Sequence, residues 1–162
     1  MTRLPSFLVA TADEYLAELR SHLGVTEDPP GSNCQPFSRQ LGRPCERWCA
    51  DLLVACARNV GLVLPSESAS TIAMADAFKA AGLWQTGSPQ PGFFAFFDFP
   101  DTAHHIQHVE VIEEVHADGT HTDIGGNTSS DDAGSQDNGG GVYRRHRSRR
   151  YVVGYGRPAY IP

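Results

Sequence analysis

The chain has 162 residues, of which 40% are hydrophobic and 20% charged, proportions typical of a soluble globular protein with a core of its own. Its net charge of -6, from 13 basic and 19 acidic side chains, argues against nucleic-acid binders and binders of anionic membranes, which need a basic surface. No apolar run approaches the roughly 20 residues of a membrane span, and residues 1–10 lack the apolar core of a signal peptide. We therefore expect one domain over residues 1–162, monomeric, without membrane insertion and with reduced thiols.

The first half of the chain carries helical patterns. Residues 11–14 (TADE) have the form of a capping box, and the leucines that follow at helical spacing predict a helix that ends at Gly24. Residues 25–43 are rich in Pro, Gly, Ser and Asn and predict a loop. A second helix is predicted from Pro44 to about Asn59, and a third over about 71–81.

From residue 89 onward the patterns are those of strands. Residues 93–99 are rich in aromatic side chains, and residues 108–116 are β-branched and alternating. Asp118-Gly119 predicts a hairpin turn into a short strand over 120–124. A polar loop over 128–141 then leads to a final pair of strands or one hairpin over 142–155. Helices followed by strands indicate the α+β class.

Cys49 is the favoured nucleophile among the four cysteines. It lies near the start of the second predicted helix, and both a helix N-terminus and a neighbouring imidazolium stabilise a thiolate. His108, at the start of a predicted strand, can supply the imidazolium, and Asn127 or Asp123 can orient its ring. Because cysteine is often simply buried in a core, we interpret Cys56 as a core residue.

Three alternatives stay open at this point. Cys45 lies nearer to the predicted helix start and competes with Cys49 as nucleophile. Cys34 could form a disulfide with Cys45 in an oxidising setting, which we do not expect. His104 and His108, four residues apart, could hold zinc together with a cysteine, but this needs a helix where the residue types favour a strand. We therefore expect neither a metal nor another cofactor.

A series of short motifs also runs through the chain. They are Gly31-Ser32-Asn33-Cys34, Phe37-Ser38, Leu41-Gly42, Trp48-Cys49-Ala50-Asp51-Leu52, Pro89-Gln90-Pro91-Gly92, His108-Val109-Glu110-Val111-Ile112, Gly125-Gly126-Asn127-Thr128-Ser129 and Val153-Gly154-Tyr155-Gly156-Arg157-Pro158-Ala159-Tyr160. In this order they resemble the CHAP domain (cysteine, histidine-dependent amidohydrolase/peptidase) over about residues 30–160. The form is that of lysins from phages that infect actinobacteria.

The resemblance implies a papain-like α+β fold that hydrolyses cell-wall peptidoglycan, its partner. The bond would be either the N-acetylmuramoyl–L-alanine amide or a peptide bond of the stem or cross-bridge. Cys49 matches the nucleophile, His108 the general base and Asn127 the residue that orients the base, while Trp48, beside the nucleophile, is expected to bind substrate. The enzyme would be made in the host cytoplasm and reach the wall through a pore such as a holin. The alternative is a wall-binding or structural module of the same fold without catalysis.

Three positions depart from the family pattern. The family often has Glu two residues before its Asn, where this chain has Gly125, so the orienting role rests on Asn127 or Asp123. A Gly often follows the His-Val pair, where this chain has Glu110, which we interpret as a surface or packing change. The frequent Pro-Gly-Asp is Pro91-Gly92-Phe93 here, which we interpret in the same way.

Overall fold

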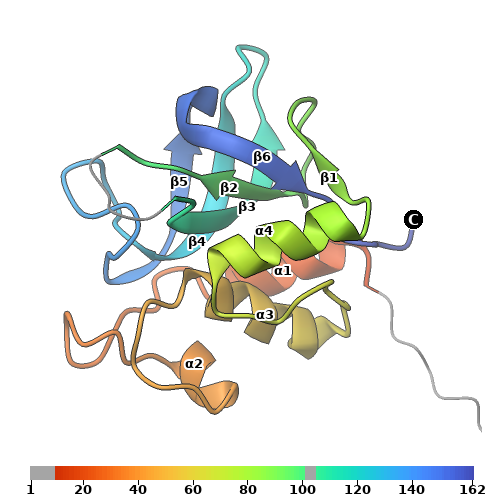
Figure 1. Cartoon of the computed structure of the whole chain (residues 1–162). Helices are drawn as coiled ribbons and strands as arrows, with labels where there is room; N and C mark the ends of the chain where they lie inside the picture. The colour runs from red at the N-terminus through yellow and green to blue at the C-terminus, as the bar shows by residue number, and fades with distance from the viewer. Residues whose placement is uncertain (1–9, 101–104) are drawn as a thin grey trace, which may run out of the picture.

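Helices occupy the first half of the chain and strands the second, in a computed structural model that describes residues 10–100 and 105–162 (Figure 1). The helices are α1 (Ala12–Ser21), α2 (Pro36–Gln40), α3 (Cys49–Val60), α4 (Thr71–Ala80) and the 3-10 turn η1 (Arg149–Tyr151). The strands are β1 (Trp84–Gln85), β2 (Phe94–Phe97), β3 (His108–Val115), β4 (His121–Thr128), β5 (Gly141–Arg147) and β6 (Val152–Gly156). The α+β class predicted from the sequence is confirmed.

The strands form one antiparallel sheet in the order β1-β6-β2-β3-β4-β5. Helices α1, α3 and α4 lie along one side of this sheet, and α2 is set farther from it (Figure 1). Helix α3 contacts both β3 and β4, the strands that carry His108 and Asn127.

Local signals set most helix ends. The side chain of Thr11 accepts a hydrogen bond from the backbone N–H of Glu14 at 3.1 Å, as the capping box predicts. Helix α3 begins at Cys49 and not at Pro44, which corrects the prediction and places the cysteine in the first position of the helix. Gly61 ends α3 in the left-handed conformation, with φ of 75°.

Two predictions for the strands and loops are corrected. The predicted loop over 25–43 contains the short helix α2, whose N-cap Gln35 accepts hydrogen bonds from two backbone N–H groups. The strand predicted to end at Ile124 continues as β4 to Thr128, which brings Gly125 and Asn127 into the sheet. Its pairing with β5 shifts register between Gly125 and Thr128, so the regular ladder is interrupted at Gly126 and Asn127.

Both faces of the sheet bury apolar side chains, which explains the continuous aromatic run of β2. Phe94 and Phe96 belong to the core between sheet and helices. Phe97 belongs to a second cluster with Ile112 and Tyr155. A strand buried on both faces has no polar alternation.

A disulfide joins Cys34 and Cys45, whose Cα atoms are 4.6 Å apart. The expectation of reduced thiols is therefore wrong for this pair, and Cys45 is removed as a competing nucleophile. Cys49 and Cys56 are free and buried.

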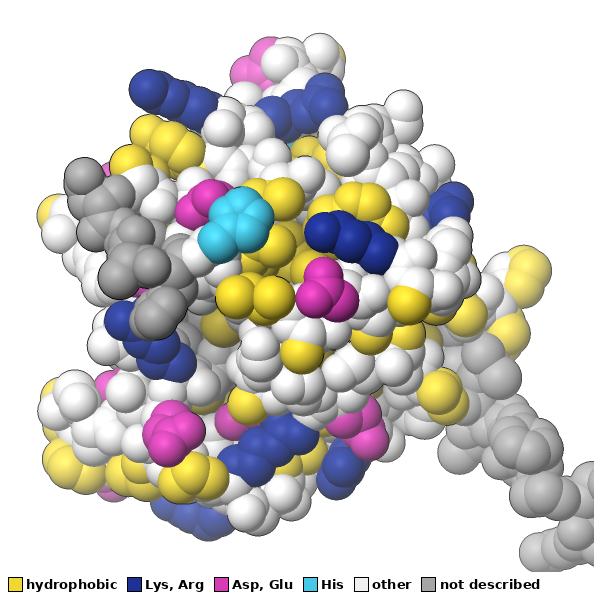
Figure 2. Space-filling view, in the orientation of Figure 1, with side chains coloured by type: hydrophobic (Ala, Val, Ile, Leu, Met, Phe, Trp, Pro, Cys, Tyr) yellow, Lys and Arg dark blue, Asp and Glu magenta, His cyan; other side chains and the backbone are white. Residues whose placement is uncertain are grey.

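Acidic and basic side chains are interspersed over the face drawn in Figure 2. Among the described residues, no helix is long and apolar enough to cross a bilayer. The first nine residues and His104, on which parts of the sequence analysis rest, lie outside the described residues.

Candidate functional site

Cys49 opens helix α3 and is almost completely buried, with 4% of its surface exposed. Its N-cap, Trp48, makes no capping hydrogen bond through its side chain, so the first-turn N–H groups are not engaged by that residue. The cysteine lines a pocket of about 190 Å³ together with Arg47, Ile106 and Gln107. The thiol therefore lies where a helix N-terminus favours negative charge and where a small pocket leads to it.

His108 is the first residue of β3 and is completely buried. Its Nε2 forms a 2.8 Å hydrogen bond with Oε1 of Glu110. Its other ring nitrogen, Nδ1, makes no hydrogen bond of normal distance and angle within the described part of the chain. Burial lowers the pKa of His108, but the Glu110 carboxylate and the neighbouring Cys49 thiol outweigh it and raise the pKa to about 9. The imidazole is thus held as an imidazolium beside the thiol at neutral pH.

Glu110 is buried within the sheet, so its interpretation as a surface change is wrong. Both of its carboxylate oxygens accept hydrogen bonds from Nε of Arg147 on β5, at 3.2 and 3.0 Å, and Oε1 also accepts one from an η nitrogen. Burial raises the pKa of Glu110, but the charges of Arg147 and His108 lower it well below its ordinary value. The carboxylate is therefore ionised and lies between two cations.

Gly125 and Gly126 on β4 each leave room for one large side chain. A Cβ at Gly125 would lie 2.5 Å from Cγ of Glu110. A Cβ at Gly126 would lie 2.6 Å from Cζ3 of Trp48. Successive residues of a strand face opposite sides of the sheet, so one glycine admits the carboxylate and the other admits the indole.

Asn127 and Trp48, two residues singled out in the sequence, lie close by in different roles. Asn127 is buried with φ of 54°, and its Nδ2 donates to the backbone carbonyl of Asp137 at 3.2 Å. Its Oδ1 has no hydrogen-bond partner among the described residues, and Nε2 of His108 bonds to Glu110 instead. Trp48 is completely buried, so it offers no surface to a substrate in this structure.

Trp48 instead fixes the segment that carries Cys49. Its indole N–H donates to Oε1 of Glu27 at 3.0 Å, and its ring stacks on Phe37 with 5.9 Å between centroids. An aromatic residue held by packing and by its polar tip cannot shift easily. Cys49, the next residue, is positioned as a result.

Asp123, the other candidate for orienting His108, serves a different histidine. Its Oδ1 lies 2.5 Å from Nδ1 of His121, and Nε2 of His121 lies 3.4 Å from the hydroxyl of Tyr155. Burial and the nearby Glu110 carboxylate raise the pKa of Asp123 to about 6 against the hydrogen bond from His121. Asp123 and His121 thus form a second buried polar pair in the sheet, and the described bonds of Asp123 go to His121 and not to His108.

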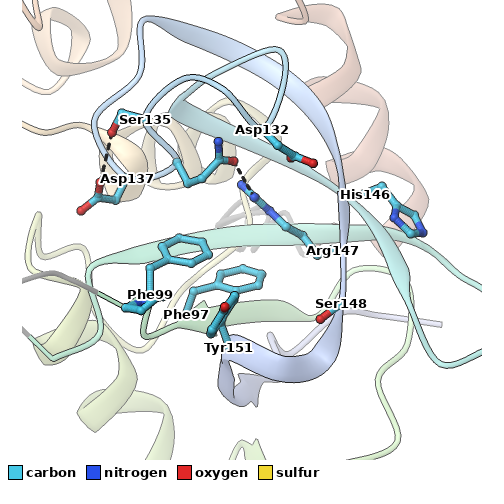
Figure 3. Close-up of a pocket in the computed structure, with 11 residues that line it drawn as sticks. Phe97, Phe99, Asp132, Ser135, Asp137, His146, Arg147, Ser148 and Tyr151 are labelled. Carbon is cyan, nitrogen blue, oxygen red and sulfur yellow. Dashed lines mark hydrogen bonds between the residues drawn. The ribbon is translucent and has the colours of Figure 1, made fainter.

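A larger pocket of about 600 Å³ is lined by Arg147, the residue that pairs with Glu110 (Figure 3). Its aromatic walls include Phe97 and Phe99, and the Arg147 guanidinium carbon lies 5.5 and 5.4 Å from their ring centroids. Phe99 also lies 6.0 Å, centroid to centroid, from the His108 ring. The pocket and the histidine are therefore neighbours.

The polar β4–β5 loop connects this pocket with the one at Cys49. Asp137 lines the larger pocket, and its carboxylate pairs with Arg47, which lines the smaller one, at 3.2 Å. Gln136 of the same loop accepts a hydrogen bond from Arg147 at 2.7 Å. Cys49 thus lines the smaller pocket, and the larger pocket is lined by Phe99, whose ring is a neighbour of His108.

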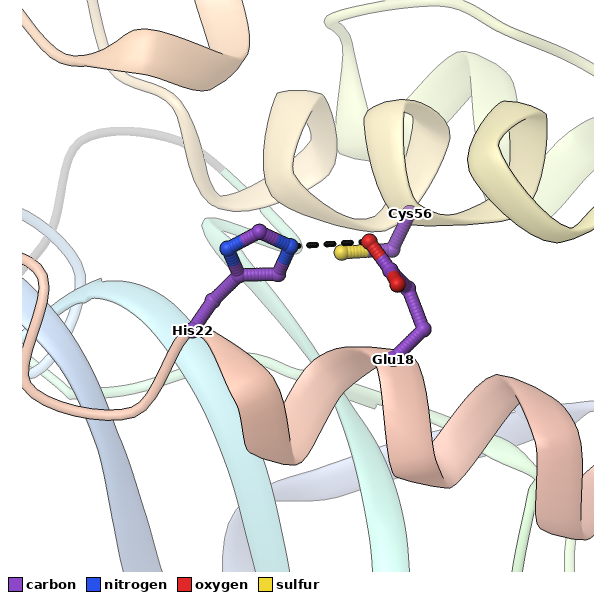
Figure 4. Close-up of side chains that lie close together, drawn as sticks. All are labelled: Glu18, His22 and Cys56. Carbon is purple, nitrogen blue, oxygen red and sulfur yellow. Dashed lines mark hydrogen bonds and ion pairs between the residues drawn. The ribbon is translucent and has the colours of Figure 1, made fainter.

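One group of metal-type donors lies apart from this constellation, between α1 and α3. Glu18, His22 and Cys56 place one donor atom each within 4.8 Å of one another (Figure 4). Oxygen, nitrogen and sulfur donors of this kind suit zinc. Two of the three side chains already have partners in protein: His22 Nε2 lies 2.8 Å from Glu18, and Asn59 donates to the same carboxylate at 2.8 Å.

The zinc site considered from the sequence used His104 and His108. His104 lies outside the described residues. His108 begins a strand, as the residue types predict, so a pair of histidines on one helical face does not form there.

The sequence reasoning missed Glu110 and Arg147 as members of the site. Alternation along β3 was a usable signal, because His108 and Glu110 are two residues apart and share a face of the strand. Arg147 comes from β5, two strands away, and no local pattern pointed to it.

Solved structures that resemble this fold include those of two proteins, LysIME-EF1 and Ly7917. The endolysin LysIME-EF1 aligns with a TM-score of 0.58 and 17% identity over 93% of this chain and 65% of that chain. Ly7917 aligns with a TM-score of 0.55 and 18% identity over 92% and 62%. A structure of Ly7917 with the hydrolyzing product of MDP gives 0.54 and 18% over 91% and 63%. The chain thus spans less than two thirds of these proteins, and identities this low show the fold alone.

A comparison with curated proteins found no match. The sequence profile of the CHAP domain matches residues 41–127, a segment that includes Cys49, His108 and Asn127. Because this match covers more than half of the 162 residues, the chain belongs to the CHAP domain family.

Proposed function

We propose that this chain is a peptidoglycan hydrolase of the endolysin type that cuts an amide bond through the Cys49 thiolate. The observation that carries the proposal is the placement of a buried cysteine in the first position of α3 beside a buried histidine with a raised pKa. Those are the requirements for a nucleophilic thiolate. The endolysin LysIME-EF1 and Ly7917, solved with the hydrolyzing product of MDP, support the choice of substrate.

In the acylation step the thiolate attacks the carbonyl carbon of the amide. N–H groups of the first turn of α3 stabilise the developing oxyanion. The C–N bond breaks as His108 gives its Nδ1 proton to the leaving nitrogen, which departs as an amine. Cys49 then carries the acyl group as a thioester.

In the deacylation step neutral His108 takes a proton from water. The resulting hydroxide attacks the thioester carbonyl, and the C–S bond breaks to release a carboxylic acid and regenerate the thiolate. Throughout, Nε2 of His108 stays bonded to a carboxylate or amide partner that keeps Nδ1 directed at the thiol. Asn127 is proposed to contribute from β4, through its free Oδ1, to the polar lining of this centre.

The two pockets that flank this centre suit an extended polymer better than a small molecule. Their volumes are about 190 and 600 Å³, and both are lined by polar and apolar side chains. Two activities remain candidates: cleavage between N-acetylmuramic acid and L-alanine, and cleavage of a peptide bond in the stem or cross-bridge. Mass spectrometry of the released fragments separates them, because only the amidase frees the amino terminus of the stem L-alanine from an intact glycan.

The catalytic test compares Cys49→Ala with Cys56→Ala, which removes the other free and buried cysteine of the same helix. We expect Cys49→Ala to lower the clearing of actinobacterial sacculi by at least about 10³-fold and Cys56→Ala to retain activity in its folded fraction. Circular dichroism verifies the fold of each variant. Clearing by Cys49→Ala at the wild-type rate would exclude the cysteine mechanism, and binding to sacculi without any release of fragments would favour a wall-binding module.

A further inference from the structure

The two departures from the family pattern, Glu110 and Gly125, lie opposite each other in the sheet. Val111 pairs with Ile124 and Ile112 with Asp123 in the antiparallel register of β3 and β4. The next pair along is therefore Glu110 with Gly125. The glutamate on β3 therefore lies directly opposite the glycine on β4.

The two positions also share one volume. A Cβ at position 125 would lie 2.5 Å from Cγ, 2.9 Å from Cδ and 3.1 Å from Oε1 of Glu110. Atoms without a bond between them do not approach this closely, so glutamate at 110 requires glycine at 125 in this backbone. Conversely, a glutamate at 125 would begin where the Glu110 side chain now ends and has the reach to place a carboxylate in the same space.

The Glu110 carboxylate is placed to set the orientation of the His108 ring. It accepts from His108 Nε2 at 2.8 Å, and Arg147 holds its other side through hydrogen bonds to both oxygens. With Nε2 engaged in this way, Nδ1 is the nitrogen left for the thiol. All three side chains are at least nine-tenths buried, so water does not screen these interactions.

We propose that Glu110 is the positioning residue of the catalytic histidine, and that Gly125 is the residue that admits it, so that the carboxylate role has moved from β4 to β3. This inference rests on the proposed cysteine mechanism and assigns one further residue to it. Asn127 and Asp123 then have other tasks, in agreement with their bonds to Asp137 and His121.

The first test is a titration of His108 by NMR, which does not depend on activity. Its signal among the seven histidines is assigned with His108→Gln. We expect Glu110→Gln, which keeps the size of the side chain, to lower the pKa of His108 by about 1 to 3 pH units. Glu114→Gln is the matched control, because Glu114 lies on the same strand with 68% of its side chain exposed. We expect it to leave the titration unchanged.

The second test exchanges the two residues. Glu110→Gly removes the carboxylate, and Gly125→Glu forces a second side chain into an occupied volume, so both single variants should lose activity on sacculi. The double variant Glu110→Gly/Gly125→Glu should exceed either single variant by at least about tenfold and return the His108 titration toward pH 9.

A His108 titration in Glu110→Gln that equals the wild type overturns the proposal, and so does a double variant no more active than the better of its two parents. A role confined to stability would lower the melting temperature without moving the His108 pKa or the alkaline limb of kcat/KM. The failure of this inference is distinct from failure of the proposed function. If Cys49→Ala is inactive while Glu110→Gln leaves the pKa of His108 unchanged, only the positioning role is refuted.

Discussion

Gly126→Ala tests whether close packing on Trp48 positions the nucleophile. The added methyl carbon would lie 2.6 Å from Cζ3 of Trp48 and 3.0 Å from Cδ2 of Leu52. Trp48 cannot retreat without cost, because it is completely buried, bonds Glu27 and stacks on Phe37.

The magnitude follows from the cost of overpacking a filled core, about 1–3 kcal/mol. For a chain of this length each kcal/mol lowers the melting temperature by about 2–4 °C, so we expect a decrease of about 2–12 °C. A shift of Trp48 also moves Cys49, the next residue, and a misplacement of about 1 Å in a catalytic group can cost about 10²-fold in rate. Activity should therefore fall more than stability alone explains.

The assay measures the free energy of unfolding in urea and the clearing of sacculi at a temperature where both proteins are folded. Gly140→Ala is the control, because a Cβ at Gly140 meets no atom within 4 Å. We expect this variant to match the wild type in both measurements. If Gly126→Ala behaves like Gly140→Ala, the argument that packing on Trp48 positions the thiol is refuted.

Three further predictions concern pH, the disulfide and the tryptophan. The pKa of His108, about 9, lies above its ordinary value of 6.5, so the contribution of His108 to stability is full below pH 6.5 and is lost as the pH rises through 9. The value of kcat/KM should fall over the same alkaline range. A fall in kcat/KM that begins near pH 6.5 would contradict the charge assigned to His108. Replacing both Cys34 and Cys45 by serine opens a link of sequence separation 11 and should lower the unfolding free energy by about 3 kcal/mol, measured in urea; an unchanged midpoint would show that the bond does not form. Trp48→Phe leaves the buried Glu27 carboxylate without its indole donor and should cost about 1–3 kcal/mol, and an equal stability would show that water or another group replaces the bond.

Sequence patterns predicted the elements whose causes are local. The capping residue Thr11 and the β-branched run after His108 both specify their element through neighbours in the chain, and the structure has α1 and β3 there. Pro44 was misleading, because proline is compatible with a first helical turn but does not require one. Cys45 is tied to Cys34 and Trp48 packs on Phe37, so tertiary contacts hold the segment before α3 outside the helix.

The residues of the proposed catalytic centre likewise divide into those with a local signal in the sequence and those without one. Cys49 and His108 could be chosen from the sequence because a helix start and a strand start are local features that carry chemistry with them. The partner of the histidine could not be chosen in this way. The role of Glu110 depends on the space left by Gly125 on the next strand and on Arg147 two strands away. Cross-strand register brings these residues together, and register is a property of the folded sheet rather than of any segment of the chain. The sequence therefore selects Cys49 and His108 as the proposed nucleophile and base, and the fold decides which carboxylate lies against His108.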